Sequence, residues 1–258
     1  MKNSAINWTD HTANFWWGCF KVSDGCKNCY AESLSNRYGK DIWGPPATTK
    51  REPKLSIWSD IKKWDREAKA EGIRRRVFVS SMSDFLEDHP MVAEMREMAM
   101  DTIERLEWLD VLMLTKRPEN AERFLSRWWG NFPAHVWVGT TVENQEAELE
   151  RVHWLLDIPA RVHFLSVEPM LEQIDLDLRG RNYGRDFPTY TEDIDWVICG
   201  GESGPKCRPF DWDWARDLRD QCKNADVAFW MKQGGGHPNK RHTFADIPED
   251  LQIRELPK

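Results

Sequence analysis

Three cysteines that lie close together in the chain are the residues best suited to chemistry. Cys19, Cys26 and Cys29 occur in the run WWGCFKVSDGCKNCYAE, separated by six residues and then by two. A glycine-containing loop with this spacing can bring three thiolates around one metal centre. Structural zinc sites usually have four protein ligands, whereas an iron–sulfur cluster held by three cysteines leaves one iron open. The pattern therefore favours a reduced, metal-binding site.

The rest of the sequence argues against a disulfide-stapled, secreted or membrane protein. The chain has 258 residues, starts with a polar segment and contains no apolar run long enough to span a membrane. We expect a cytoplasmic protein that makes no contact with membranes. Its net charge of −7 argues against a protein that coats nucleic acid through its overall field, although a local basic groove is compatible with it.

The 15 tryptophans are an unusual feature of the composition. Because tryptophan buries a large area, we expect most of them in the core. The alternative is that some of them, such as Trp16 and Trp17 just before the first cysteine, form a stacking wall beside the cysteine loop.

Short apolar runs alternate with amphipathic, charged stretches through most of the chain. The predicted strands cover residues 76–80, 111–115, 136–140, 161–166, 196–200 and 227–231, and the predicted helices 91–106, 119–128, 144–156 and 212–224. The earlier part adds an opening strand near residues 6–9, the cysteine loop at 15–32 and helices near 30–37 and 59–70. Buried strands that alternate with helices are typical of βαβ units and a parallel sheet.

This alternation predicts an α/β fold, in which a parallel sheet with outer helices forms a full or partial (β/α) barrel. An open, doubly wound sheet is the alternative. No long linker interrupts the pattern, so we expect residues 1–258 to form a single barrel-like domain. Residues 179–192 are predicted to be an inserted loop, and residues 234–258 an irregular tail.

Polar residues collect where the predicted strands end. In α/β barrels and open α/β sheets the carboxyl ends of the strands carry the active site, so a shared polar pocket is expected there. The alternative is that each group only caps the following helix. The residues are Ser80, Ser81 and Asp84; Thr115, Lys116 and Arg117; Thr141, Glu143 and Asn144; Ser166 and Glu168; Gly201, Glu202 and Ser203; and Lys232 and Gln233.

Two glycines and a glutamate, Gly200, Gly201 and Glu202, follow the fifth of these strands. Glycines after a buried strand allow a ligand to approach the backbone, and the carboxylate can accept hydrogen bonds from an amine or from ribose hydroxyls. The segment is not a phosphate loop, because it lacks the Gly-Lys-Ser/Thr element. Among the other cysteines, Cys199 and Cys222 are expected in the core, and Cys207 is a candidate fourth ligand or reactive thiol.

Six segments together resemble a known family: WWGCFKVSDGCKNCYAE, LMLTKRPEN, VGTTVENQ, FLSVEPML, ICGGESG and FWMKQGG. In this order they resemble the phage-associated Gp37/Gp68 proteins, also called DUF5131, whose architecture is similar to that of radical S-adenosylmethionine (SAM) enzymes. The resemblance implies a 4Fe–4S cluster on Cys19, Cys26 and Cys29, with SAM on the open iron. Tyr30, just after the last cysteine, stands near the place of an aromatic residue that precedes it in those enzymes.

The resemblance also implies roles for the polar strand ends. Lys116, Arg117 and Lys232 would bind a phosphate or carboxylate. Glu143, Glu168 and Glu202 would bind the SAM amine, its ribose or a substrate amine. The cofactor-facing set would be Gly200, Gly201, Glu202, Ser203, Thr141, Asn144 and Ser166. The reaction would be hydrogen abstraction, with an electron donor as partner and, from the phage context, a nucleic acid or modified nucleotide as substrate in the host cytoplasm. Lys50-Arg51 and residues 74–76 are candidate phosphate contacts or else a solvated charged face.

Two other functions are compatible with the residues. A non-enzymatic adaptor or nucleic-acid-binding protein could use the three cysteines with His11 or Cys207 as a closed zinc site that fixes the loop. A metal-independent hydrolase or nuclease could use the acidic residues at the strand ends, but it would leave the cysteines without a role.

Overall fold

The computed structural model describes residues 1–176, 178, 194–204, 206–235 and 244–258. Its main sheet has seven strands in the order β1-β4-β5-β6-β7-β8-β9, and the strand pairs whose register is described are parallel. The order ends at β1 and β9, so the sheet is that of a partial rather than a closed barrel within the described part of the chain. The predicted α/β class with a parallel sheet and outer helices is confirmed.

The chain divides into two compact units. Unit 1 comprises residues 1–22 and 29–137, and unit 2 comprises residues 23–28 and 138–258. The first unit therefore contains Cys19 and Cys29, and the second contains Cys26. The prediction of a single domain over residues 1–258 stays a prediction.

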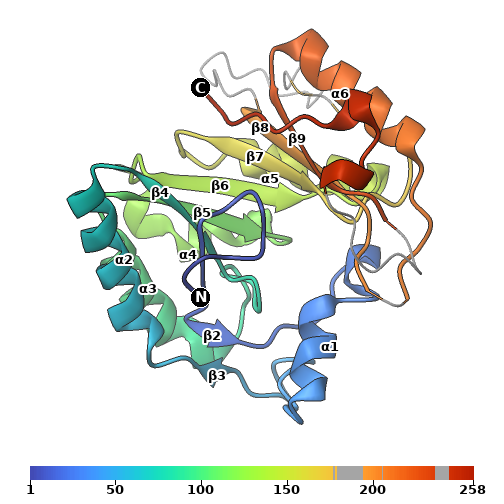
Figure 1. Cartoon of the computed structure of the whole chain (residues 1–258). Helices are drawn as coiled ribbons and strands as arrows, with labels where there is room; N and C mark the ends of the chain where they lie inside the picture. The colour runs from blue at the N-terminus through green and yellow to red at the C-terminus, as the bar shows by residue number, and fades with distance from the viewer. Residues whose placement is uncertain (177, 179–193, 205, 236–243) are drawn as a thin grey trace. The chain divides into compact units, whose positions relative to one another are not determined.

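Unit 1 is built on strands β1 (His11–Ala13), β4 (Arg75–Val79) and β5 (Leu109–Thr115), with helices α1 (Tyr30–Arg37), α2 (Ile57–Glu71), α3 (Ala93–Ile103) and α4 (Ala121–Phe124). Figure 1 shows α2 and α3 beside β4 and β5. Helix α2 buries Ile57, Ile61, Trp64 and Ala68, whose spacing of four, three and four residues places them on one face. It ends at Gly72, whose φ of +66° is a left-handed cap that glycine adopts readily.

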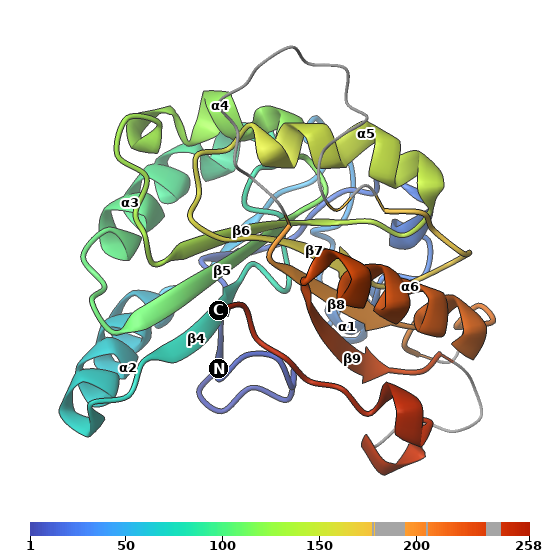
Figure 2. The same cartoon turned by 90° about the horizontal axis from the view of Figure 1, so that it is seen from above.

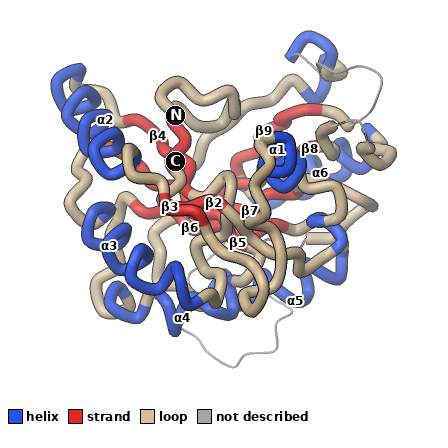
Figure 3. Tube along the Cα trace, turned by 90° about the horizontal axis from the view of Figure 1, so that it is seen from below, coloured by secondary structure: helices blue, strands red, loops and turns tan. Residues whose placement is uncertain are grey.

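A second, two-stranded sheet lies in unit 1 and was not predicted. Strand β2 (Trp16–Trp17) pairs antiparallel with β3 (Glu52–Pro53), and the two lie side by side in Figure 3. Trp16 is fully buried against Phe85, whereas Trp17 is half-buried. Trp16 is therefore a core residue, and only Trp17 remains available to a surface.

Unit 2 contains the last residues of β6 (Val136–Thr141) and strands β7 (His163–Val167), β8 (Trp196–Gly200) and β9 (Ala228–Gln233). Its helices are α5 (Gln145–Leu156) and α6 (Trp212–Ala225). Helix α6 packs on β8 and β9, as Figure 2 shows. The Asp211 side chain accepts a 2.9 Å hydrogen bond from the backbone of Asp213 and so caps the start of α6.

The six predicted strands from residue 76 onward are confirmed, and β8 has the predicted bounds. The opening strand near residues 6–9 is wrong, because the chain enters the sheet at His11–Ala13. The helix predicted at 119–128 is broken into α4 and two flanking 3-10 turns. In the tail, residues 244–258 are less irregular than expected: the Met231 backbone N–H donates to the Ile253 carbonyl at 2.9 Å, and Leu251 is buried. The inserted loop predicted at 179–192 lies outside the described residues.

Arg51 lies in the interior of unit 1. It is 1 % exposed, its Nε donates to Glu87 Oε2 at 2.8 Å, and its Nη2 donates to Oε1 at 2.5 Å. The third guanidinium nitrogen, Nη1, donates to the Ile42 carbonyl at 3.2 Å. The prediction of Arg51 as a phosphate contact is wrong, because the paired guanidinium is fully buried.

The arginines at 74–76 are also engaged by acids. Arg74 pairs with Asp110 at 2.6 Å and Arg75 with Glu71 at 2.7 Å, while Arg76 lies 3.7 Å from Asp10. These pairs favour the interpretation of a solvated charged face over that of a phosphate site.

Removing one partner of the Arg51–Glu87 pair should destabilise the protein strongly. We expect Arg51→Ala to lower the free energy of unfolding by about 3–5 kcal/mol, because it leaves a buried carboxylate uncompensated. Urea unfolding followed by tryptophan fluorescence measures this change. Arg123→Ala, which removes an exposed pair with Asp88, is the control and should have little effect. Equal effects of the two substitutions would contradict the assignment.

Candidate active site at the cysteine loop

The cysteine loop follows the carboxyl end of β1. None of Cys19, Cys26 and Cys29 is in a disulfide, and all three are half-buried. A short 3-10 turn covers Asp24–Cys26, and Cys29 lies directly before the first residue of α1. The loop thus begins at a strand of the parallel sheet and ends at a helix, which is the position that active-site loops take in α/β folds.

The backbone around Cys19 is fixed by close packing in unit 1. Gly18 has a φ of +112°, and a Cβ at this position would lie 2.4 Å from the Ile42 carbonyl oxygen. The Cys19 carbonyl accepts a 2.9 Å hydrogen bond from the Gly44 N–H. Only glycine satisfies both the backbone angle and the close approach, so Gly18 sets where the Cys19 thiol lies.

A buried ion pair lies directly beside the Cys19 sulfur. Arg117 Nη1 donates to Asp84 Oδ2 at 2.7 Å and lies 3.7 Å from Cys19 Sγ, and Nη2 donates to the Phe20 carbonyl at 2.9 Å. The guanidinium also stacks on the Phe20 ring, 4.4 Å from its centroid. Arg117 therefore contacts both the sulfur and the backbone of the loop.

Asp84 is the anchor of this pair. It is 4 % exposed and also accepts hydrogen bonds from Thr115 Oγ1 at 2.7 Å and from the Lys116 N–H at 3.0 Å. Burial alone would raise the pKa of Asp84, but the Arg117 charge and these hydrogen bonds hold it below its usual value. For Cys19, burial raises the pKa of the thiol to about 12, while Arg117 acts in the opposite direction.

In unit 2, two carboxylates hold the segment of residues 23–28, which carries Cys26. Glu143 is fully buried, pairs with Arg151 of α5 at 2.8 Å, and accepts a 3.3 Å hydrogen bond from the Gly25 N–H. A Cβ on Gly25 would lie 2.9 Å from the Glu143 carboxyl carbon, so the close approach favours glycine.

Glu202 is the second of these carboxylates. Asn28 Nδ2 donates to its Oε2 at 2.9 Å, and Arg208 Nη2 donates to its Oε1 at 2.7 Å. The same Arg208 nitrogen donates to the Asp24 carbonyl at 3.0 Å. Burial acts to raise the pKa of Glu202, but the hydrogen bonds from Arg208 and Asn28 outweigh it, and the pKa is lowered. Glu143 and Glu202 were predicted as ligand-facing residues, and here they bind the loop itself.

Another polar group lies at the strand ends of unit 2. The Lys232 ammonium pairs with the Glu168 carboxylate, and Gln233 Nε2 donates to the Gly201 carbonyl at 3.1 Å. Both charged side chains are less than one-fifth exposed. Gly201 has no room for a side chain, because its Cβ would lie 2.1 Å from the Gly235 nitrogen.

The other predicted site residues occupy varied places. Asn144 caps α5 by accepting from the Ala147 N–H at 2.9 Å, so the helix-cap interpretation holds for it. The Tyr30 hydroxyl donates to the Ser81 carbonyl at 2.8 Å in unit 1. Thr141 and Ser166 are buried, Gly200 ends β8, Ser203 is exposed, and Lys116 is half-buried. The sequence analysis did not identify Asn28, Arg151 and Arg208 as site residues. The one available signal was that a buried carboxylate such as Glu143 or Glu202 needs a hydrogen-bonding partner.

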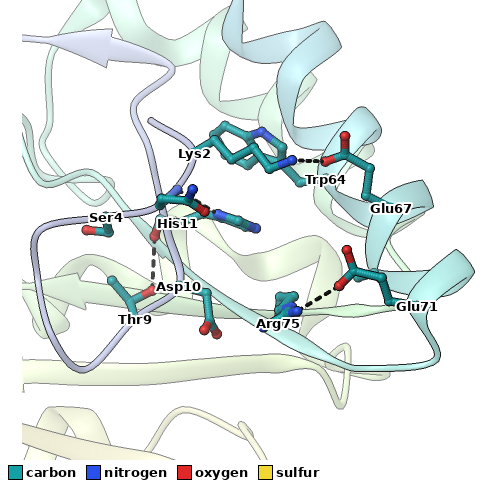
Figure 4. Close-up of a pocket in the computed structure, with 11 residues that line it drawn as sticks. Lys2, Ser4, Thr9, Asp10, His11, Trp64, Glu67, Glu71 and Arg75 are labelled. Atoms are coloured by element: carbon teal, nitrogen blue, oxygen red, sulfur yellow. Dashed lines mark hydrogen bonds and ion pairs between the residues drawn. The ribbon is translucent and has the colours of Figure 1, made fainter.

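A pocket of unit 1 lies at the amino ends of β1 and β4, away from the carboxyl end of β1 where the cysteine loop begins. Figure 4 shows His11 between the Lys2–Glu67 pair (2.9 Å) and the Arg75–Glu71 pair (2.7 Å). His11 Nδ1 accepts a 3.3 Å hydrogen bond from the Asn3 N–H, and the ring packs on Trp64. His11, the alternative zinc ligand, is thus part of this pocket.

The three cysteines outside the loop differ in burial. Cys199 and Cys222 are fully buried, as expected for core residues, and Cys207 is half-buried. Within the described ranges, no three His, Cys, Asp or Glu residues form a group that could hold a metal ion. In the same ranges, no helix is long and apolar enough to cross a membrane. The metal-ligand roles of the three loop cysteines stay predictions.

Comparison with known proteins gives a family and a fold. The model of the family described as "Protein of unknown function (DUF5131)" matches residues 3–254. The fold is similar to that of spore photoproduct lyase: a cysteine-to-alanine mutant with dinucleoside spore photoproduct has a TM-score of 0.56 and 11 % identity, with 90 % of this chain and 78 % of that chain covered. A second structure of that mutant has a TM-score of 0.53 and 10 % identity, with the same coverage. No curated protein sequence matches the chain.

The Asp84–Arg117 pair should make stability depend on pH. Because the pKa of Asp84 is lowered in the folded state, its contribution is present above the ordinary carboxyl pKa of about 3.9 and is lost as the pH falls below it. We expect Asp84→Asn to cost about 3–5 kcal/mol at pH 7 and progressively less towards pH 3. Urea unfolding at several pH values tests this, with the exposed Asp88→Asn as control. A cost that does not change with pH would refute it.

The hydrogen bonds that hold residues 23–28 should slow chemical modification of the Cys26 thiol. Arg208→Ala removes the hydrogen bonds to Glu202 and to the Asp24 carbonyl, so we expect alkylation of Cys26 by iodoacetamide to become about tenfold faster. Mass spectrometry of the modified peptides measures the rate. Arg216→Ala, which removes an exposed pair with Asp213, should leave it unchanged. An unchanged alkylation rate in the Arg208 variant would show that the Arg208 hydrogen bonds do not hold this segment.

Proposed function

We propose that this chain, which belongs to the DUF5131 family, is an iron–sulfur enzyme of the radical-SAM type that acts by hydrogen abstraction. One observation carries the proposal. A loop with three cysteines that are not in disulfides continues from the carboxyl end of the first strand of a parallel, partial-barrel sheet, in a fold similar to that of spore photoproduct lyase.

The chemistry of the donor set fits a 4Fe–4S cluster. Three thiols are available, none is in a disulfide, and none is fully buried. Cluster ligands bind as thiolates, and burial alone opposes ionisation of Cys19. The Arg117 guanidinium at 3.7 Å partly offsets this effect of burial, and Cys19, Cys26 and Cys29 would hold the cluster. Three ligands also leave one iron for SAM.

When bound, such a cluster would supply one electron for the cleavage of SAM to methionine, and the 5′-deoxyadenosyl fragment would supply the hydrogen-abstracting chemistry. The protein's own residues have other tasks. Arg117 and Asp84 hold the loop at Cys19, and Glu143 and Glu202 hold the segment that carries Cys26. Since their carboxylates are buried and paired, their role in this proposal is to position the loop.

The strand ends of unit 2 are the proposed ligand-facing groups. Gly200, Gly201, Ser203, Thr141, Ser166 and Tyr30 are the candidate contacts to SAM. The Lys232 ammonium would bind a phosphate or carboxylate of the substrate, and Glu168 would accept from an amine. Lys116, half-buried after β5, is a candidate contact of the same kind in unit 1.

The proposed substrate class is a nucleic acid or a modified nucleotide. It is supported by the similar fold of the spore photoproduct lyase mutant, whose structure was solved with dinucleoside spore photoproduct. An external electron donor would be needed to reduce the cluster. A cytoplasmic location is part of the proposal, because iron–sulfur clusters on reduced thiols suit that compartment. The phage origin is proposed only from the resemblance to phage-associated proteins.

Anaerobic reconstitution with iron and sulfide tests the proposal. We expect about four irons per chain, a broad absorption band that dithionite bleaches, and an electron paramagnetic resonance (EPR) signal that changes when SAM is added. Alanine at Cys19, Cys26 or Cys29 should lower the iron content and abolish the SAM-dependent change.

Cys207→Ser is the matched control, because it alters a half-buried cysteine outside the loop. It should keep the full iron content. One tightly bound zinc ion that resists exchange, with no such spectrum, would refute the proposal. Loss of that zinc in the Cys207 variant would support the alternative of a four-ligand structural site.

A further inference from the structure

A group of cations and aromatic rings lies on the surface of unit 1, around the small β2–β3 sheet. We name it the Trp17 surface, and it consists of Trp17, Arg37, Tyr38, Lys40, Lys50 and Lys54. Strand pairing places Trp17 opposite Glu52, which fixes the half-buried indole on the sheet. None of these residues has a role in holding the cysteines.

Two lysines are arranged around the Trp17 ring. The ammonium of Lys54 lies 3.7 Å from the ring centroid, and that of Lys40 lies 5.6 Å from it. Both ammonium groups also donate to the Glu52 carboxylate, which pairs with Lys54 at 2.6 Å. One carboxylate therefore pairs with two ammonium groups, so the three side chains together carry a net positive charge beside the indole ring.

Two further cations border this group along the chain. Arg37 ends α1, and Lys50 precedes β3 by two residues; both are exposed, and neither side chain has a described partner. The exposed Asp41 is the nearest acidic neighbour in sequence to Lys40. Counted along these neighbouring segments, there are four cations and two carboxylates, Glu52 and Asp41, in a chain whose net charge is −7.

Tyr38 adds an open aromatic face. Its side chain is 61 % exposed, and its ring centroid lies 6.4 Å from that of Trp17. An exposed ring of this size beside unneutralised cations suits a flat, anionic ligand, because a base can stack on the ring while its phosphate meets the cations.

We propose that the Trp17 surface binds single-stranded nucleic acid, with Tyr38 stacking on a base and Arg37 and Lys50 contacting phosphates. The inference deepens the proposed function and rests on it for the identity of the substrate, but the binding itself requires neither cluster nor SAM. An acidic peptide would use the cations without the ring. A duplex would hide its base faces, so single strands are favoured over both.

Fluorescence anisotropy with a labelled dT12 oligonucleotide tests the proposal on the full chain, as purified and after reconstitution. We expect Tyr38→Ala to weaken binding roughly 5- to 100-fold, the range for loss of one stacked base. Arg37→Ser/Lys50→Ser should also weaken it. In that double variant the slope of log K against log salt concentration should fall by about 1.4, because each single-strand phosphate contact contributes about 0.7.

The matched control is Lys62→Ser/Arg66→Ser, which removes one lysine and one arginine from exposed positions of α2. It should leave dT12 affinity and salt slope unchanged. Equal losses in both double variants would overturn the proposal, since only the overall charge would then matter. The proposal would also be overturned if a hairpin duplex, polyglutamate or vesicles with one-quarter phosphatidylserine bound as tightly as dT12. If the protein binds dT12 but cannot be loaded with a cluster, the nucleic-acid-binding role of the Trp17 surface would be supported. The failure to load a cluster would then refute only the proposed enzyme.

Discussion

The buried ion pair between Arg117 and Asp84 is the interaction on which the cysteine end of unit 1 depends. A guanidinium that is 4 % exposed is costly unless its donors are used, and here they reach a carboxylate, a backbone carbonyl and a cysteine sulfur. Replacing such a pair by apolar residues often costs no stability, but it would remove the oriented N–H donors that contact Cys19 and the Phe20 carbonyl. The pair is better explained by the position that it gives Cys19 than by the stability that it adds.

The same logic applies in unit 2, where Glu143 and Glu202 each have an arginine partner and a backbone or amide donor from residues 23–28. A carboxylate that is already paired has little capacity left for a soluble ligand. Glu168 and Lys232 differ from them, because their pair is partly exposed and adjoins two glycines. The strand ends thus separate into groups that hold the loop and groups that remain open to solvent.

Much of the sheet could be predicted from the sequence, because buried parallel strands are continuous apolar runs. The run WVICG predicted β8 with its bounds, whereas β1 was missed because its residues, HTA, carry two polar side chains that are buried by their neighbours. The two-residue strands β2 and β3 were beyond prediction for a related reason: their pairing is set by packing of Trp16, not by a local pattern. The cysteine loop was found from its spacing alone. The residues that hold it were not, because Glu143, Glu202 and Arg208 lie 118, 174 and 184 residues along the chain from the loop residues that they bind, and they reach the loop only through the fold.

Net charge was a poor guide to local binding surfaces. At physiological ionic strength the field of a charge is screened over about 8 Å, so distant acids have little influence on a phosphate at the Trp17 surface. What matters there is the local count, in which Lys40 and Lys54 share one carboxylate and Arg37 and Lys50 have no described partner. Several acids elsewhere are paired with arginines, as in the ion pairs of Arg74, Arg208 and Arg216. An acidic protein can therefore present a cationic surface wherever its carboxylates are paired with other groups.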